Sequence, residues 1–285
     1  MAIEGSGTYY NNMYRAIFLI LIFILAHTAC AAKELAVTID DLPFLYGRYL
    51  SDSAQGAKFH DILRTLKRHK IKIIGFVVGS RVDSKTAPLL DDLIADGHTI
   101  GNHTYTHPDL NTTSIASYED DIAKGETAIS KWVGKTRYFR YPFLHQGPTD
   151  HKYIGIANYL AAHAYINVPV TIDNDDWLYN RDFTEARKNR DTALADSIGQ
   201  EYLAHMQKMT LYYDSIAVAK LHRDIKHILL IHMTELNAVY LDSLLNWYES
   251  QAWKFVTPQE ALTDPVYQIN DTYIGENGIS WILRF

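Results

Sequence analysis

The chain has 285 residues, of which 47% are hydrophobic and 21% charged, a balance typical of a globular protein and not of a disordered one. Its 27 basic and 33 acidic residues give a net charge of −6, and no basic stripe is present, which argues against nucleic acid as a partner. The single cysteine, Cys30, excludes an internal disulfide framework and a cysteine-rich metal site.

The N-terminal region has the pattern of a secretory signal. An apolar run of 11 residues, 16–26, follows Arg15 and is shorter than the roughly 20 residues of a membrane span. Small residues at 29–31 resemble a cleavage site, so we predict a signal peptide at 1–31 and one exported (periplasmic or secreted) domain at 32–285. Met13 is an alternative start, lipid attachment at Cys30 is a less favoured anchor, and a buried N-terminal helix is the structural alternative.

Strand-like and helix-like segments alternate along the rest of the chain. Runs rich in β-branched and aromatic residues predict strands at 35–39, 71–78, 98–102, 138–141, 164–171, 227–232 and 254–256. Helices are predicted between them at 57–69, 87–96, 117–133, 150–163, 191–221 and 237–251. This order predicts a single-domain α/β fold, a distorted (β/α) barrel with about seven parallel strands. The long polar segment 191–221 is expected to decorate the barrel.

Polar residues follow five of the predicted strands at their carboxyl ends, where ligands and catalytic groups collect in such folds. They are Asp40 and Asp41, His103 and His107, Arg140, residues 173–177, and His232. The fold would bring these side chains around one mouth of the barrel.

Each of these signals alone has an ordinary interpretation. With 13 histidines in the chain, a pair spaced like His103 and His107 arises readily by chance, and adjacent aspartates often cap a loop. Together they point to a cation, because Asp40 and Asp41 end an apolar strand with two like charges. Two imidazoles and one carboxylate form the ligand set of an open zinc site, in which the metal lowers the pKa of water and polarises a carbonyl. The second aspartate is then free to act as a base.

In these motifs the chain resembles the polysaccharide deacetylase family, also called the NodB-homology group or carbohydrate esterase family 4, from residue 35 to about residue 261. The motifs occur in the family's order: Thr38-Ile39-Asp40-Asp41, His103-Thr104-Tyr105-Thr106-His107, Arg140-Tyr141-Pro142-Phe143, Asp176-Trp177 and Leu230-Ile231-His232. Two departures concern the substrate more than the chemistry: Ile39 stands where the family has Phe, and Phe143 stands where it has Tyr.

The resemblance implies a role for each matching residue. It implies Asp41, His103 and His107 as metal ligands, Asp40 as the catalytic base and Arg140 as the residue that orients the base. It further implies that the Phe143 N–H holds the oxyanion, that Trp177 and Leu230 line the acetyl pocket, that His232 is the general acid and that Asp176 tunes it. Asp173 and Asp175 compete with Asp176 for this last role, and we choose Asp176 because it adjoins Trp177.

These roles predict a metal-dependent hydrolase that removes N-acetyl groups from amino-sugar units of a glycan such as peptidoglycan, a chitin-like oligomer or an exopolysaccharide. The expected cofactor is one divalent ion, Zn²⁺ by default, with Co²⁺ or Ni²⁺ as substitutes. The expected partner is an acetylated glycan, without nucleic acid or a stable membrane span. The alternatives are an O-acetyl esterase, a deformylase or deacetylase acting on a lipid-linked sugar, and a non-catalytic glycan-binding module.

Overall fold

The strands of the described residues form one parallel sheet in the order β5-β4-β3-β2-β1-β6, with β7 paired to β1. They are β1 (Glu34–Leu42), β2 (Ile74–Val77), β3 (Thr99–Asn102), β4 (Arg137–Phe139), β5 (Tyr165–Asn167), β6 (Lys226–His232) and β7 (Lys254–Phe255). This computed structural model describes residues 32–44 and 49–285, so the predicted signal peptide lies outside the described residues. Residues Lys33–Phe285 form one compact unit.

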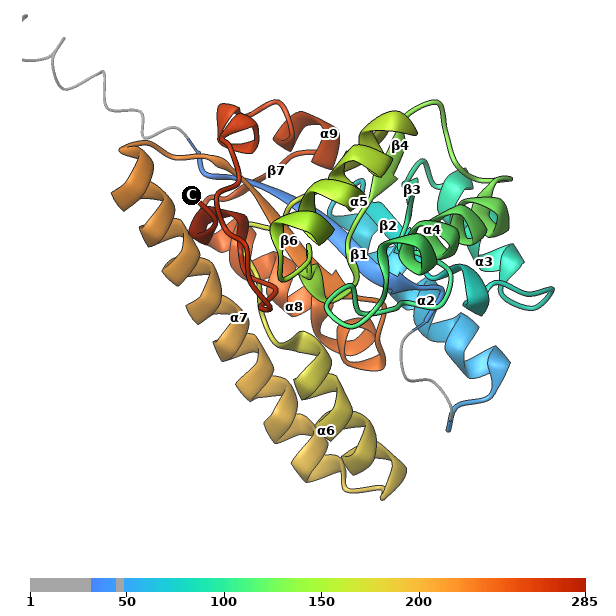
Figure 1. Ribbon diagram of the computed structural model, residues 1–285. Coiled ribbons are helices and arrows are strands. Elements are labelled where there is room, and N and C mark those ends of the chain that lie inside the picture. Colours follow the sequence, from blue (N-terminus) through green and yellow to red (C-terminus); the bar gives the residue numbers. More distant parts are fainter. Residues whose placement is uncertain (1–31, 45–48) are drawn as a thin grey trace, which may run out of the picture. The chain divides into compact units, whose positions relative to one another are not determined.

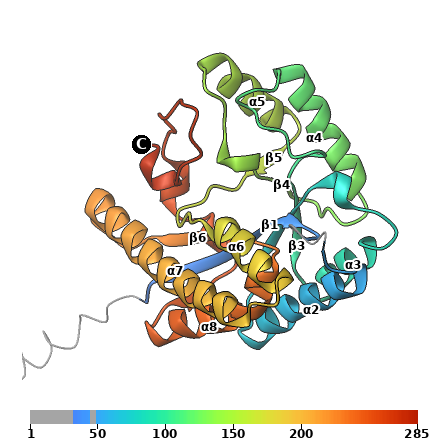
Figure 2. The same ribbon diagram turned by 90° about the horizontal axis from the view of Figure 1, so that it is seen from below.

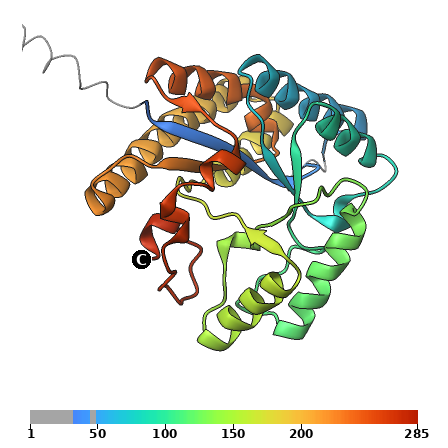
Figure 3. The same ribbon diagram turned by 90° about the horizontal axis from the view of Figure 1, so that it is seen from above.

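Helices surround the strands (Figures 2 and 3). They are α2 (Asp52–Arg68), α3 (Ala87–Ala95), α4 (Ile115–Ile129), α5 (Asp150–Ala162), α6 (Asp176–Lys188), α7 (Thr192–Leu221), α8 (Glu235–Ser250) and α9 (Pro258–Ala261). Short 3₁₀ turns are η1 (Gly79–Arg81), η2 (Pro142–Leu144), η3 (Pro265–Gln268) and η4 (Trp281–Leu283). Eight of the nine residues of β1 are buried, as expected for a parallel strand covered on both faces.

The sheet curls so that residues near its two edges meet, which confirms the predicted distorted barrel. β5 is shorter than predicted because Pro169, which has no N–H to donate, follows it. The chain then runs beside β6, where Ile172 forms an isolated parallel bridge with Leu229. The residues between β5 and Asp173 therefore connect the β5 edge of the sheet to β6.

The region between β5 and β6 differs most from the sequence prediction. We did not predict α6, and the expectation that residues 191–221 only decorate the barrel is wrong. α7 lies along α6 (Figure 1) and buries a stripe at helical spacing that includes Ala195, Tyr202, Met206 and Tyr213. These side chains belong to the main hydrophobic core, so α7 is structural in this barrel.

Local capping sets where two helices begin. α4 begins before the predicted residue 117 because the hydroxyl of Ser114 accepts a hydrogen bond of 3.2 Å from the N–H of Ser117. In the same way, Ser51 caps α2 through the N–H of Ala54. Within the described part of the chain, no helix is long and apolar enough to cross a lipid bilayer.

Candidate active site

The two aspartates at the end of β1 are both buried but have different neighbours. Asp40 is paired in register with His232 of β6, and its carbonyl accepts a hydrogen bond from the N–H of Met233. Asp41 has a left-handed backbone, with φ of 65°, and its carbonyl accepts a hydrogen bond of 2.9 Å from Arg81. The sharp turn after Asp40 therefore gives adjacent carboxylates separate environments.

His103 and His107 are held by a tight turn after β3 rather than by a helix. Thr104 and His107 have left-handed φ values of 65° and 62°, and the Thr104 hydroxyl accepts a hydrogen bond from the N–H of His107. The carboxylate of Asp121 in α4 accepts from the N–H groups of Tyr105 and Thr106. The turn brings the two imidazole rings to 4.8 Å between centroids.

Asp41, His103 and His107 lie together as the sequence predicted. One ligand atom from each residue lies within 4.8 Å of the others, and Nε2 of His107 is 3.6 Å from Oδ1 of Asp41. The Nδ1 of His103 donates to the carbonyl of Arg140 at 2.8 Å, which leaves its Nε2 lone pair for a metal. Such a hydrogen bond from the second ring nitrogen is usual for a metal-binding histidine.

The charge state of this group suits a divalent cation. Burial lowers the pKa of both His103 and His107, although the charge of Asp41 opposes this effect, so both imidazoles stay neutral. Burial would raise the pKa of Asp41, but the positive charges of Arg81 and of the protonated His232 act against burial, and the pKa is lowered. Oδ1 of Asp41 is buried and makes no hydrogen bond within the described residues, although Nη1 of Arg81 lies 3.0 Å away. Two neutral imidazoles and one carboxylate with an unsatisfied oxygen fit a divalent ion.

Asp40 is paired with Arg140 at the bottom of the site. Nη1 of the fully buried Arg140 donates hydrogen bonds of 2.7 Å to Oδ1 of Asp40 and to the hydroxyl of Thr38. Its Nε donates to the carbonyl of Val168, and its guanidinium stacks 4.3 Å from the ring centre of Phe76. Burial raises the pKa of Asp40 to about 6 despite the charge of Arg140, which suits a base near neutral pH.

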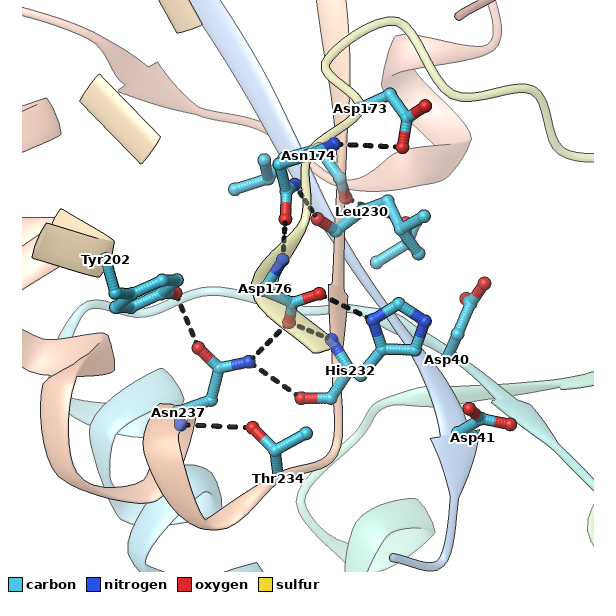
Figure 4. Close-up of polar contacts among 12 residues, drawn as sticks. Asp40, Asp41, Asp173, Asn174, Asp176, Tyr202, Leu230, His232, Thr234 and Asn237 are labelled. Carbon is cyan, nitrogen blue, oxygen red and sulfur yellow. Dashed lines mark hydrogen bonds and ion pairs between the residues drawn. The ribbon is translucent and has the colours of Figure 1, made fainter. Parts of the chain in front are cut away.

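His232 is held by a network behind the cavity (Figure 4). Its Nδ1 lies 2.6 Å from Oδ1 of Asp176, and its backbone N–H donates to Oδ2 of the same carboxylate at 2.8 Å. Asn237 donates to Asp176 and to the carbonyl of His232, while its own Oδ1 accepts from the hydroxyl of Tyr202. Burial alone would lower the pKa of His232, but the charge of Asp176 outweighs burial and raises it to about 9. His232 is therefore protonated at neutral pH.

The three candidate aspartates after β5 are distinguished by their positions. Asp176 is fully buried against His232, whereas Asp173 and Asp175 line the cavity. The amide of Asn174 links the segment to the site, because it donates to the carbonyl of Leu230 and accepts from the N–H of Asp176. The structure thus puts the residue chosen from the sequence, Asp176, in contact with His232.

One cavity of about 510 Å³ joins most of the predicted residues. Those that line it are Asp40, Asp41, His103, His107, Phe143, Trp177, Leu230 and His232. Arg140 and Asp176 lie behind this surface and contact Asp40 and His232, respectively. Phe143 and Trp177 are 53% and 41% exposed as whole residues, and both line the cavity, so they can meet a ligand.

Phe143 lies in a strained turn beside the metal-ligand candidates. Phe143 and Leu144 both have left-handed backbones, with φ of 58° and 56°, and the Phe143 ring packs 4.6 Å from that of His107. The N–H of Phe143 makes no hydrogen bond to any acceptor among the described residues. The N–H is therefore free to donate, and Phe143 lines the cavity.

Sequence reasoning missed several residues that shape the site. Arg81 contacts Asp41 and lines the cavity. Its position shortly after β2, at the carboxyl end of a strand, could have indicated a place in the site. Asn237 and Tyr202 had no such signal, because Asn237 reaches Asp176, and Tyr202 reaches Asn237, from helices distant in the chain. Residues 277 and 278, also far along the sequence, form another part of the wall.

The fold and site together define an α/β-barrel protein with a candidate metal-dependent hydrolytic centre. The model of the family described as polysaccharide deacetylase matches residues 28–162, which include Asp40, Asp41, His103, His107 and Arg140. The match confirms, over residues 28–162, the resemblance to this family seen in the motifs.

Similar proteins of known name include a peptidoglycan-N-acetylglucosamine deacetylase from Bacillus cereus, 28% identical over 146 residues, or 50% of this chain and 46% of that protein. A chitin deacetylase from Colletotrichum lindemuthianum is 34% identical over 114 residues, or 38% of this chain and 41% of that one. The chain thus spans less than half the length of these two relatives.

Solved structures share the fold. A family 4 acetyl xylan esterase from Clostridium thermocellum, in complex with a cobalt ion, has a TM-score of 0.55 at 24% identity and covers 81% of this chain and 91% of that one. A CE4 family pseudoenzyme from Bacillus anthracis also has a TM-score of 0.55, at 20% identity, with 81% and 66% covered. Because the same fold carries both active and inactive centres, activity has to be judged from the residues of the site.

Proposed function

We propose that this protein is a divalent-metal-dependent hydrolase that removes N-acetyl groups from amino-sugar units of a glycan. The observation that carries the proposal is that Asp40 and His232 line the same cavity as the group of Asp41, His103 and His107. A base, an acid and a metal site therefore face one space of about 510 Å³, which is enough for a sugar unit.

A divalent cation bound by Asp41, His103 and His107 would supply Lewis-acid chemistry, lowering the pKa of water and polarising the acetyl carbonyl. Asp40 accepts the proton of the water that attacks the carbonyl carbon. Its pKa of about 6 lets it do so near neutral pH, and Arg140 keeps its carboxylate in place.

The N–H of Phe143 donates to the oxyanion that forms when the carbonyl carbon becomes tetrahedral. A preorganised donor of this kind is worth about 3 kcal/mol of transition-state stabilisation. His232, whose Nδ1 is bound by Asp176, then gives the proton on its other ring nitrogen to the leaving amide nitrogen. The C–N bond breaks and acetate and a free amine are released.

The metal identity and the location of the protein are further proposals. We infer zinc, because two imidazoles and a carboxylate are a usual set for catalytic Zn²⁺. We also infer export, because of the signal-like residues 1–31 and because the relatives include peptidoglycan deacetylases, whose substrate lies outside the cytoplasm.

Acetate release tests the proposal. Metal-loaded protein is incubated with N-acetylglucosamine oligomers, peptidoglycan fragments and acetylated xylan, and the products are analysed by mass spectrometry for loss of acetyl groups. We expect loss from the amino-sugar substrates and none after chelation. Release from acetylated xylan alone would indicate an O-acetyl esterase, and activity that survives complete metal removal would contradict the mechanism.

A further inference from the structure

Residues 276–278 close one side of the active-site cavity, although they follow the turn at Phe143 at a great distance in sequence. Asn277 and Gly278 line the same cavity as Asp40 and His232. The carbonyl of Glu276 accepts a hydrogen bond of 2.7 Å from the side chain of Asn111. This segment is thus part of the site and lies outside the family match at residues 28–162.

Gly278 makes an unusually close backbone contact with the Phe143 turn. A Cβ atom at position 278 would lie 1.8 Å from the carbonyl oxygen of Phe143 and 3.0 Å from Cβ of Leu144. Gly278 does not have a positive φ, so its own backbone does not require glycine. The requirement comes from the close approach of two backbones.

The turn that Gly278 touches needs support. Phe143 and Leu144 are two successive residues with Cβ atoms in the left-handed region, which persists only where the surroundings fix it. Within the turn, the N–H groups of Leu144 and His145 donate to the carbonyls of Tyr141 and Pro142, at 3.0 and 3.1 Å. The contact with Gly278 adds a restraint from outside the turn.

The segment that carries Gly278 is itself firmly attached. The N–H of Trp281 donates to the carbonyl of Val170 at 2.6 Å, and the buried hydroxyl of Ser280 donates to the carbonyl of Thr171 at 2.8 Å. Residues 170 and 171 belong to the stretch that runs beside β6. The chain just after Gly278 is therefore hydrogen-bonded to the barrel wall.

We propose that residues 276–278 fix the Phe143 turn, with Gly278 as a positioning residue for the N–H that stabilises the oxyanion, an inference that rests on the proposed function. Gly278 acts through Phe143, because the three atoms nearest to a Cβ at position 278 belong to Phe143 and Leu144. Its loss should lower kcat without moving Asp40 or His232.

The test compares Gly278→Ala with Gly134→Ala, a matched control in which the new methyl group meets nothing within 4 Å. Complete removal of an oxyanion donor lowers kcat by about 10²- to 10³-fold. In Gly278→Ala the Phe143 N–H is displaced and not removed, so we expect a smaller fall in kcat, of about 10- to 100-fold. KM should change less than about threefold, and the shape of the pH–kcat profile should stay that of the wild type. Hydrogen exchange at Leu144 and His145, followed by mass spectrometry, should accelerate in Gly278→Ala and not in the control.

Two results with folded Gly278→Ala would overturn the inference: wild-type kcat, or a lower kcat with unchanged exchange at residues 144 and 145. If Gly278→Ala does not fold, Ser280→Ala takes its place, because it loosens the segment two residues away. Faster exchange in Ser280→Ala at residues 144 and 145 supports the inference, and unchanged exchange overturns it. If the wild-type protein releases no acetate, the proposed function fails, and the exchange comparison still decides whether Gly278 holds the turn.

Discussion

The neighbouring carboxylates Asp40 and Asp41 show how surroundings assign different chemistry to identical side chains. Burial raises the pKa of Asp40 to about 6, despite Arg140 beside it. For Asp41 the same burial is opposed by the positive charges of Arg81 and the protonated His232, and the pKa falls. Asp40 can therefore accept a proton near neutral pH, whereas Asp41 stays ionised as a ligand, a separation typical of paired catalytic carboxylates.

These roles predict that some substitutions lower kcat and that others remove the metal. Asp40→Asn and His232→Ala should each lower kcat by about 10²- to 10⁴-fold, because general acid–base catalysis contributes about that much. Both variants should retain metal, whereas His103→Ala should lose it. Acetate release and metal content by mass spectrometry check both points.

Exposed residues of the same types supply the controls. Asp120→Asn changes a carboxylate paired with Lys124 on the surface, and His151→Ala changes an exposed histidine of α5. Both should behave as the wild type. Normal deacetylation by Asp40→Asn would refute the assignment of the base.

The partner of His232 is one of three nearby aspartates, and residue type does not distinguish them. Asp173, Asp175 and Asp176 are all carboxylates within four positions, so residue type alone ranks none of them. The beginning of α6 decides, because it turns Asp176 toward His232 and leaves Asp175 on the cavity rim. The sequence preference for Asp176 rested on its neighbour Trp177 and not on this geometry.

Neighbouring strands are joined at their beginnings by a buried imidazole. His98, just before β3, accepts a hydrogen bond of 3.2 Å at Nδ1 from the N–H of Ile73, just before β2. Burial lowers the pKa of His98 to about 4, with a smaller contribution from Lys72. The neutral imidazole is therefore the form that the folded protein needs.

This pKa shift makes stability depend on pH in a defined direction. The contribution of neutral His98 to the unfolding free energy is fully present above pH 6.5, the ordinary pKa of histidine. It is lost as the pH falls through about 4, because His98 binds a proton at higher pH in the unfolded chain than in the folded protein. The shift corresponds to about 3 kcal/mol. In His98→Asn, which keeps an acceptor and does not titrate, the unfolding free energy should fall less between pH 6.5 and 4.

Urea denaturation at several pH values measures this difference, with His151→Asn as an exposed control. Parallel pH curves for the wild type and His98→Asn would contradict the prediction.

α7 contributes to the site from behind. Tyr202 donates to Asn237 at 2.6 Å, and Asn237 in turn donates to Asp176, the partner of His232. Tyr202→Phe leaves the buried Oδ1 of Asn237 without this donor, so we expect a loss of about 1 kcal/mol in unfolding free energy. We expect a fall in kcat of less than about tenfold, since Asp176 keeps its contact with His232.

Tyr212→Phe on the same helix is the matched control, because Tyr212 is 49% exposed. Denaturant unfolding and kcat are measured for both variants. Equal stability of the two would show that the Tyr202 hydroxyl does not support the network.

The candidate metal centre draws its ligands from two strand ends that the barrel brings together. Asp41 lies near the end of β1, and His103 and His107 come after β3, with β2 between the two strands in the sheet. A ligand that binds the folded state alone stabilises it by about 2.7 kcal/mol at a concentration 100 times its Kd. Chelation should therefore lower Tm as well as abolish activity, and added Zn²⁺ should restore both.

Calorimetry of the wild type and of His103→Ala, with and without chelator, checks this prediction. His103→Ala should show no chelator-dependent change in Tm, because it has lost a ligand. An unchanged Tm for metal-loaded wild-type protein after full metal removal would argue against this site.

The sequence by itself determined the alternation of strands and helices, because buried parallel strands need continuous apolar runs and helices need an apolar stripe. It also determined which strand ends carry reactive side chains. The distances between these side chains, the contact that distinguishes Asp176 from Asp173 and Asp175, and the parts of α7 and residues 276–278 in the site come from the tertiary structure. Those contacts join residues far apart in the chain, and neither periodicity nor spacing encodes them, because they depend on how the barrel closes.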